Sequence, residues 1–108
     1  MATTLIRKQI AVTAVTATTL YTVPAATQTV TSSVIVCNRG AVLSTFRVAL
    51  RALGVATTND SYLYYDVTIA PNDTFVATIG IVLIATDILE VYASTSNLTF
   101  QMAGQENT

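Results

Sequence analysis

The stretch from residue 30 to residue 50 constrains the fold more than any other part of the sequence. It begins with a mostly β-branched apolar run at residues 34–37, breaks at residues 38–40 where a glycine ends a polar triplet, and then alternates strictly. Successive side chains of a strand point to opposite sides, so the alternation predicts a strand with one apolar and one wet face. The residues of its two faces are Phe46, Val48 and Leu50 on one side and Arg47 and Arg51 on the other. We therefore expect two strands joined by a turn, the first buried on both faces, at the centre of the fold.

The rest of the chain repeats these signals at near-regular spacing. Short apolar or alternating runs are separated by turn-forming clusters, such as the Pro-Asn-Asp at residues 71–73, and no helical pattern exceeds one turn. This pattern predicts an all-β fold, a single β-sandwich of about eight antiparallel strands with jelly-roll or immunoglobulin-like connections. A helix over residues 79–89 is an alternative, because isoleucine, leucine and alanine run together there, but the β-branched content and flanking turns disfavour it.

The chain has 108 residues, enough for one domain with a single core. Residues 1–8 are expected to form an N-terminal arm, residues 9–103 the β-sandwich, and residues 104–108 a polar tail. An arm of this kind can stay disordered or lie across a neighbouring subunit.

Charge is scarce in this sequence. Charged residues make up 10% and apolar residues 52%, and the formal net charge is -1, so much of the wet surface must be threonine, serine, asparagine and glutamine. Such a surface protects poorly against association, and we expect a homo-oligomer or a protein bound to another protein. No basic patch is available for nucleic acid, and the longest apolar run, residues 79–85, is far shorter than the roughly 20 residues of a membrane span.

The sequence offers little for catalysis. It contains no histidine, and its one cysteine, Cys37, lies in an apolar run where we expect it to be buried. Neither a Ser-His-Asp nor a Cys-His arrangement can therefore be assembled. Asp60, Asp73 and Asp87 lie in turns, where aspartate is favoured because it hydrogen-bonds nearby backbone. We expect no enzyme activity, no catalytic or metal-binding residues and no cofactor.

The remaining candidates are outward-facing arginines and tyrosines. Arg47 and Arg51 share one face of their strand, and alternation over residues 62–69 places Tyr62 and Tyr64 on the wet face of the next. Tyrosine and arginine are enriched at the centres of protein interfaces, so pairing of these strands would create a contact surface. The full set of protein-contact candidates is Arg39, Arg47, Arg51, Tyr62, Tyr64 and Asp66.

Two other interpretations of this surface stay open. Asp66 and Glu90 could simply neutralise the arginines across strands, with the tyrosines covering exposed sheet. Alternatively, Tyr62 and Tyr64 could stack against sugar rings, as in a carbohydrate-binding module.

Four segments, taken in order, resemble a group of small virion structural proteins of tailed bacteriophages. They read LYTVPA at residues 20–25, VCNRG at 36–40, YLYYD at 62–66 and ATDILEVYA at 85–93, and the similarity extends over about residues 10–103. The resemblance implies a β-sandwich on the capsid surface of the virion, a head decoration (cement) protein that binds the major capsid protein between capsomers. A tail-fibre, collar or baseplate protein is the alternative. We expect a homotrimer, since quasi-threefold positions between capsomers offer three equivalent seats.

Overall fold

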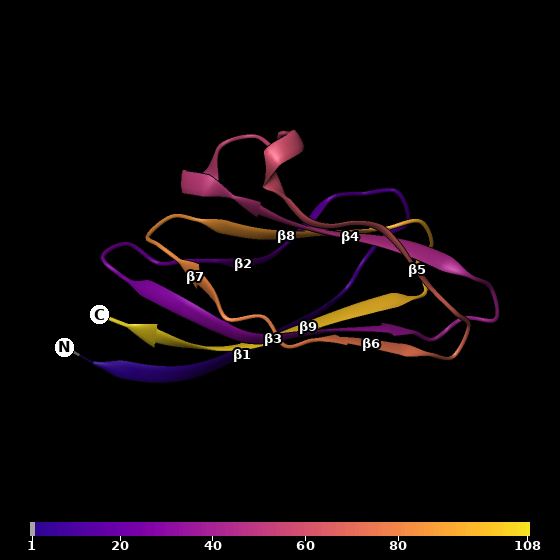
Figure 1. Ribbon diagram of the computed structural model, residues 1–108, viewed down its shortest axis with the longest axis horizontal. Helices are drawn as coiled ribbons and strands as arrows, with labels where there is room; N and C mark the ends of the chain where they lie inside the picture. The colour runs from indigo at the N-terminus through magenta and orange to yellow at the C-terminus, as the bar shows by residue number, and fades with distance from the viewer. Residues whose placement is uncertain (1) are drawn as a thin grey trace.

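Two antiparallel β-sheets packed face to face make up the fold in the computed structural model, which describes residues 2–108 (Figure 1). Sheet A contains, in spatial order, β1 (Thr3–Ala11), β9 (Leu98–Asn107), β3 (Gln28–Asn38) and β6 (Thr74–Ala77), with β7 (Ile81–Leu83) paired to the other end of β3. Sheet B contains β2 (Thr18–Thr22), β8 (Ile88–Ala93), β4 (Ser44–Arg51) and β5 (Tyr62–Ile69). Two short 3-10 turns, η1 (Ala52–Gly54) and η2 (Asn59–Ser61), lie between β4 and β5. The predicted all-β sandwich is confirmed, with nine strands.

The strand order distinguishes between the two connection patterns that the sequence left open. Strands β6 and β7 pair with different parts of β3 and so occupy the place of one broken strand. With these two counted together, the chain alternates between the sheets except from β4 to β5, which are neighbours in sheet B, and gives the two four-stranded layers of a jelly roll. The jelly-roll alternative therefore fits this chain, and the immunoglobulin-like one does not.

The stretch from residue 30 to residue 50 forms two strands, but they lie in opposite sheets. Strand β3 lies inside sheet A between β9 and β6, and β4 lies inside sheet B between β8 and β5. The corner between them is fixed by the buried side chain of Asn38, which donates to the carbonyls of Val42 (2.9 Å) and Ile69 (3.2 Å) and accepts from the Gly40 amide (2.9 Å). The predicted pair of strands joined by a turn is therefore present, and the polar break turns the chain from one layer to the other.

The first of these strands is also more exposed than expected. Val34 and Val36 are buried between the sheets, whereas Ile35 and Cys37 alternate with them on the outer face and are half-buried. No second layer of residues 2–108 covers this outer face. The predicted burial of Cys37 is therefore wrong.

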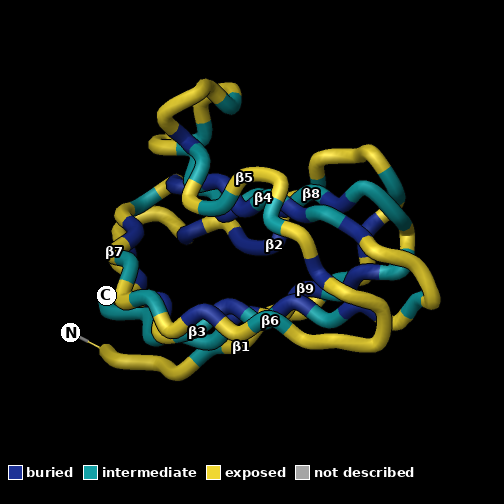
Figure 2. The backbone as a smooth tube through the Cα atoms, turned by 45° about the vertical axis from the view of Figure 1, so that its right-hand side comes forward, coloured by how far each residue is buried: buried dark blue, intermediate teal, exposed yellow. Residues whose placement is uncertain are grey.

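The core lies between the two sheets, where dark buried segments face each other in Figure 2. Phe46 is fully buried at its centre, with ring centroids of Phe75 at 5.2 Å, Phe100 at 6.2 Å and Tyr64 at 6.5 Å. Aromatic rings at these separations pack at tilted or edge-on angles that suit their charge distribution. This cluster joins β4 and β5 of sheet B to β6 and β9 of sheet A.

Strands lie near both ends of the part of the chain that the structure describes. Strand β1 pairs with β9 in one unbroken antiparallel register from Thr3 opposite Asn107 to Ala11 opposite Thr99, and the Thr108 amide donates to the Ala2 carbonyl (2.9 Å). The expected loose arm at residues 1–8 and polar tail at 104–108 are therefore corrected, with Met1 outside the described residues. Each segment supplies the backbone hydrogen-bond partners that the other requires. Neither segment alone carries an apolar pattern strong enough to predict this pairing.

A buried tyrosine ties the C-terminal strand to the opposite sheet. The Tyr21 hydroxyl of β2 donates to Glu106 Oε2 (2.5 Å) and lies 2.8 Å from the Thr29 hydroxyl. Burial, together with the hydrogen bond to Glu106, raises the pKa of Tyr21 to about 12.

Stability should therefore fall in strong alkali because of Tyr21. The unfolded chain loses this proton near pH 10, so the contribution of protonated Tyr21 is complete below pH 10 and is lost as the pH rises towards 12. Urea unfolding measured from pH 8 upward should show the decline, and Tyr21→Phe should show a shallower one. Because the other tyrosines are present in both proteins, parallel curves for the two would contradict the assignment.

Turns occupy the segments where aspartates were expected to hydrogen-bond nearby backbone. Asp73 accepts the amide of Thr74 (2.8 Å), Asp60 accepts the Thr58 hydroxyl, and buried Asp87 accepts the amides of Leu53 (2.8 Å) and Ile84 (3.0 Å). The predicted bonding to nearby backbone is confirmed for Asp73 and Asp87, whereas Asp60, within η2, bonds a side-chain hydroxyl. The alternative helix over residues 79–89 does not form, since β7, this turn and the start of β8 occupy it. Among residues 2–108, no helix is long and apolar enough to cross a membrane.

Candidate functional site

The outer face of sheet B gathers most of the predicted contact residues around Arg47. Its Nε atom donates to Asp66 Oδ1 (2.6 Å) and its Nη2 atom to Asp66 Oδ2 (3.3 Å). The guanidinium carbon lies 4.3 Å from the ring centroid of Tyr65 and 4.5 Å from that of Tyr92. Hydrogen bonding to Asp66 raises the pKa of Arg47 above its ordinary value, so the cation is held between two rings and one carboxylate. We call Arg47, Tyr62, Tyr65, Asp66 and Tyr92 the tyrosine–arginine cluster.

A β-bulge in β5 decides which tyrosines join this cluster. Phe46 pairs with Val67 and Val48 with Tyr64, so Tyr65 and Asp66 together oppose one residue of β4. Asp66 has φ 51°, the left-handed region that aspartate tolerates better than most residues. The extra residue reverses the alternation on one side of the bulge, and a second register shift between Val48 and Ala49, which pairs with Tyr62, breaks it again.

Tyr64 therefore points inward and Tyr65 outward. The Tyr64 ring packs against Phe75, with centroids 5.4 Å apart, whereas Tyr65 is exposed and meets Tyr62 edge-on at 4.8 Å. The prediction that Tyr64 shares the wet face with Tyr62 is wrong, because simple alternation does not hold across a bulge.

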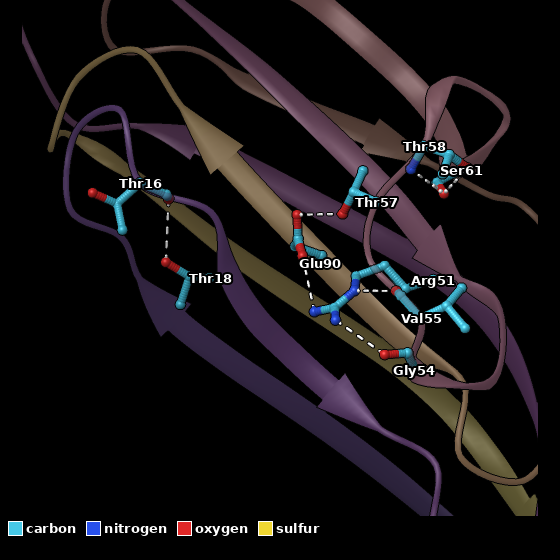
Figure 3. Close-up of polar contacts among 9 residues, drawn as sticks. All are labelled: Thr16, Thr18, Arg51, Gly54, Val55, Thr57, Thr58, Ser61 and Glu90. Carbon is cyan, nitrogen blue, oxygen red and sulfur yellow. Dashed lines mark hydrogen bonds and ion pairs between the residues drawn. The ribbon is translucent and has the colours of Figure 1, made fainter.

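A second polar group on the same face is centred on Arg51 (Figure 3). Its guanidinium donates to the carbonyls of Val55 (2.8 Å) and Gly54 (3.1 Å) and to Glu90 Oε2 (3.2 Å). The Thr57 hydroxyl donates to the other oxygen of Glu90 (3.1 Å). Arg51 thus holds the connection between β4 and β5 against the sheet.

Replacing Arg51 with lysine should loosen this connection without unfolding the sandwich. A lysine presents one compact ammonium in place of the planar fork that reaches both carbonyls and Glu90. Loss of hydrogen bonds to a charged group weakens local closure by about 1–3 kcal/mol, so amides of residues 52–58 should exchange about tenfold faster or more. Hydrogen exchange followed by mass spectrometry measures this. Arg39→Lys is the matched control, and equal exchange in both variants would contradict the role of Arg51.

The tyrosine–arginine cluster and the Arg51 group border one shallow groove of about 410 Å³. Its walls include Arg47, Arg51, Thr57, Tyr62, Glu90 and Tyr92. Both arginines are paired with carboxylates, so the groove carries little net charge. This pairing matches the interpretation in which Asp66 and Glu90 neutralise the arginines.

Sequence reasoning placed some of these residues correctly and missed others. Arg47, Arg51, Tyr62 and Asp66 lie together, but Arg39 lies in the β3–β4 connection, where it donates to the Ser96 carbonyl (3.2 Å). Tyr92 was missed although the alternation of β8, with Leu89, Val91 and Ala93 buried, places it outward. Tyr65 could not be found this way, because the bulge has no distinctive sequence signal.

The positions of these side chains also bear on whether the surface can stack against a sugar or hold a metal ion. The predicted sugar-stacking pair does not form, since Tyr64 faces the core and Arg47 lies over the rings of Tyr65 and Tyr92. Within residues 2–108, no group of three or more histidine, cysteine, aspartate or glutamate side chains is placed to hold a metal ion.

The outer face of sheet A has a different character. Cross-strand rows place Gln105, Val30 and Val82 side by side, and Gln101, Ile35 and Val76 side by side. We call these six residues the sheet A face; Val76 and Val82 are about 60% exposed. All six side chains are uncharged, which makes this face a candidate for contact with another protein.

Neither a scan against models of known protein families nor a search of curated proteins finds a match for the sequence.

Proposed function

We propose that this chain is a structural protein of a tailed-bacteriophage virion, a head decoration protein that binds the capsid surface between capsomers. The observation that carries the proposal is the sheet A face, an uncharged surface of valine, isoleucine and glutamine side chains on adjacent strands. Burying these six side chains against a shell removes exposed valines from water and leaves no charge among them to desolvate. Arg7 lies on the same face in the neighbouring border strand β1, opposite Ala103.

Two further points support this proposal. The four sequence segments resemble small phage virion proteins, and the jelly roll is a fold that viral capsid proteins use. The fold is support by analogy only, because the same architecture occurs in lectin domains.

A decoration protein can act through modest contacts. A capsid repeats the same seat many times, and a trimer engages three equivalent seats at once, so each added contact becomes effectively intramolecular. We propose that three copies sit around quasi-threefold positions. The tyrosine–arginine cluster then lies on the opposite sheet, free for contacts between copies or with other virion proteins.

Copy number on tail-free heads tests the proposal. Heads purified without tails should contain this protein in a fixed ratio to the major capsid protein, measured by quantitative gel. Intact virions with a few copies, all lost with the tails, would instead support a tail-fibre, collar or baseplate protein. Absence from virions altogether would reject both structural roles.

Re-addition to undecorated heads tests which face makes the contact. A Val76→Glu, Val82→Glu double variant should bind about tenfold more weakly or worse, because two carboxylates would be buried unpaired at the interface. Leu53→Glu is the control, since Leu53 is similarly exposed at 61% but lies in η1, between β4 and β5, and not on the sheet A face. Equal binding by the double variant and the control would exclude the sheet A face.

A further inference from the structure

The free edge of β1 is a surface that the proposed function does not use. Strand β1 pairs with β9 alone and forms the border of sheet A, where Figure 1 shows it in indigo. Its register with β9 is unbroken over all nine residues. The other edges are blunted: β2 and β5 have register shifts, and β6 and β7 are four and three residues long. Natural sheets commonly interrupt edges in these ways, so a long regular edge is an exception that needs a reason.

The register shows which backbone groups of this edge are unpaired. The hydrogen bonds from Thr108 to Ala2 and from Val12 to Leu98 fix the even-numbered residues of this segment as those bonded to β9. In an antiparallel ladder, the odd-numbered residues then turn their amides and carbonyls outward. The strand contains no proline, and Leu5 in its middle is 81% exposed. The edge can therefore accept another strand without rearrangement.

Charge indicates what kind of strand fits. Arg7 and Lys8 lie at the centre of the edge on opposite faces, and neither forms an ion pair among the residues that the structure describes. A second copy pairing antiparallel in full overlap would set Arg7 against Arg7, and like charges directly opposite are destabilising. A strand with acidic side chains on both faces would pair with each cation.

We infer that the β1 edge binds an extended acidic segment of a partner protein by strand addition. Backbone hydrogen bonds to Leu5, Arg7 and Gln9 provide the affinity, and the two cations select against a second copy and in favour of an acidic strand. This inference goes beyond the virion role, because the edge and its charges do not depend on where the protein resides.

A designed peptide tests the edge directly. The probe is a blocked nine-residue peptide with the sequence Thr-Glu-Glu-Thr-Glu-Glu-Thr-Val-Thr, added to the isotope-labelled full chain and followed by NMR. Peptide at ten times its Kd should slow amide exchange of Leu5, Arg7 and Gln9 by about tenfold, and raising the salt concentration should weaken the effect. A peptide with lysine in place of each glutamate should have no effect.

Edge variants separate strand addition from simple charge attraction. Gln9→Pro removes one outward amide but no bond to β9, and it should abolish protection at Leu5 and Arg7 as well. Gln9→Ala is its control and should keep full binding. Equal protection by the acidic and basic peptides, or binding that survives Gln9→Pro, would overturn the inference. Protection of these amides without peptide that grows with protein concentration would overturn it in favour of a second copy.

Discussion

Replacing Phe46 with alanine should lower the free energy of unfolding by about 3–5 kcal/mol, the range for deleting a buried phenylalanine side chain. Phe46 is 0% exposed and touches three other aromatic rings, two of them from the opposite sheet. The cavity would open at the point where β4 and β5 meet β6 and β9, and the strands on its walls cannot close it without breaking their ladders. A loss of this size is a large part of the total stability of a small domain, about 5–15 kcal/mol.

Urea unfolding followed by circular dichroism measures this effect. Val76→Ala is the control, because Val76 is 59% exposed on the outer face of sheet A and its truncation should change stability by no more than about 0.5 kcal/mol. A Phe46→Ala variant within about 1 kcal/mol of the unchanged protein, a threshold well below the range for core truncation, would show that this ring does not join the sheets.

The sequence identified strands better than it identified their neighbours. Alternation at Phe46, Val48 and the two arginines predicted the inner and outer faces of β4, because burial enforces a period of two along one strand. It could not show that β3 and β4 lie in different sheets, since a turn signal marks a change of direction and not the layer that the chain enters. Pairing partners depend on contacts far apart in sequence.

The candidate site was only partly predictable for a related reason. Arg47, Arg51 and Tyr62 were placed together correctly because the two strands do pair. The exchange of Tyr64 for Tyr65 depends on one backbone conformation, the positive φ of Asp66. Aspartate adopts that conformation more readily than most residues but does not require it, so nothing in the local sequence marks the bulge. The outer ends of the terminal strands, residues 3–8 and 104–107, were missed because β1 and β9 each supply the partner that the other lacks there.

Gly104 is a position where that long-range pairing depends on the absence of a side chain. It lies in β9 opposite Ile6 of β1 and Thr31 of β3, beside the irregularity in β3 between Thr31 and Ser33. A Cβ atom at Gly104 would lie 2.5 Å from the Val30 carbonyl oxygen and 3.2 Å from the Thr31 Cα atom. These are backbone atoms, so relief requires that β9 move away from β3.

Gly104→Ala should therefore destabilise the protein by about 1–3 kcal/mol, the usual cost of an added methyl group in a tightly packed site. Because β1 is attached to sheet A only through β9, the substitution should speed amide exchange in β1 and in residues 103–107 more than in the core strands of sheet B.

Gly80→Ala is the matched control. A Cβ atom at Gly80 would meet no atom within 4 Å beyond its chain neighbours, and alanine there should be neutral or stabilising through the unfolded chain. If both variants unfold at the same urea concentration, the close approach of β9 to β3 at Gly104 does not exist in solution. If Gly104→Ala alone is destabilised but its exchange rises evenly over both sheets, the β1–β9 pair is part of the single cooperative core and not a separately opening unit.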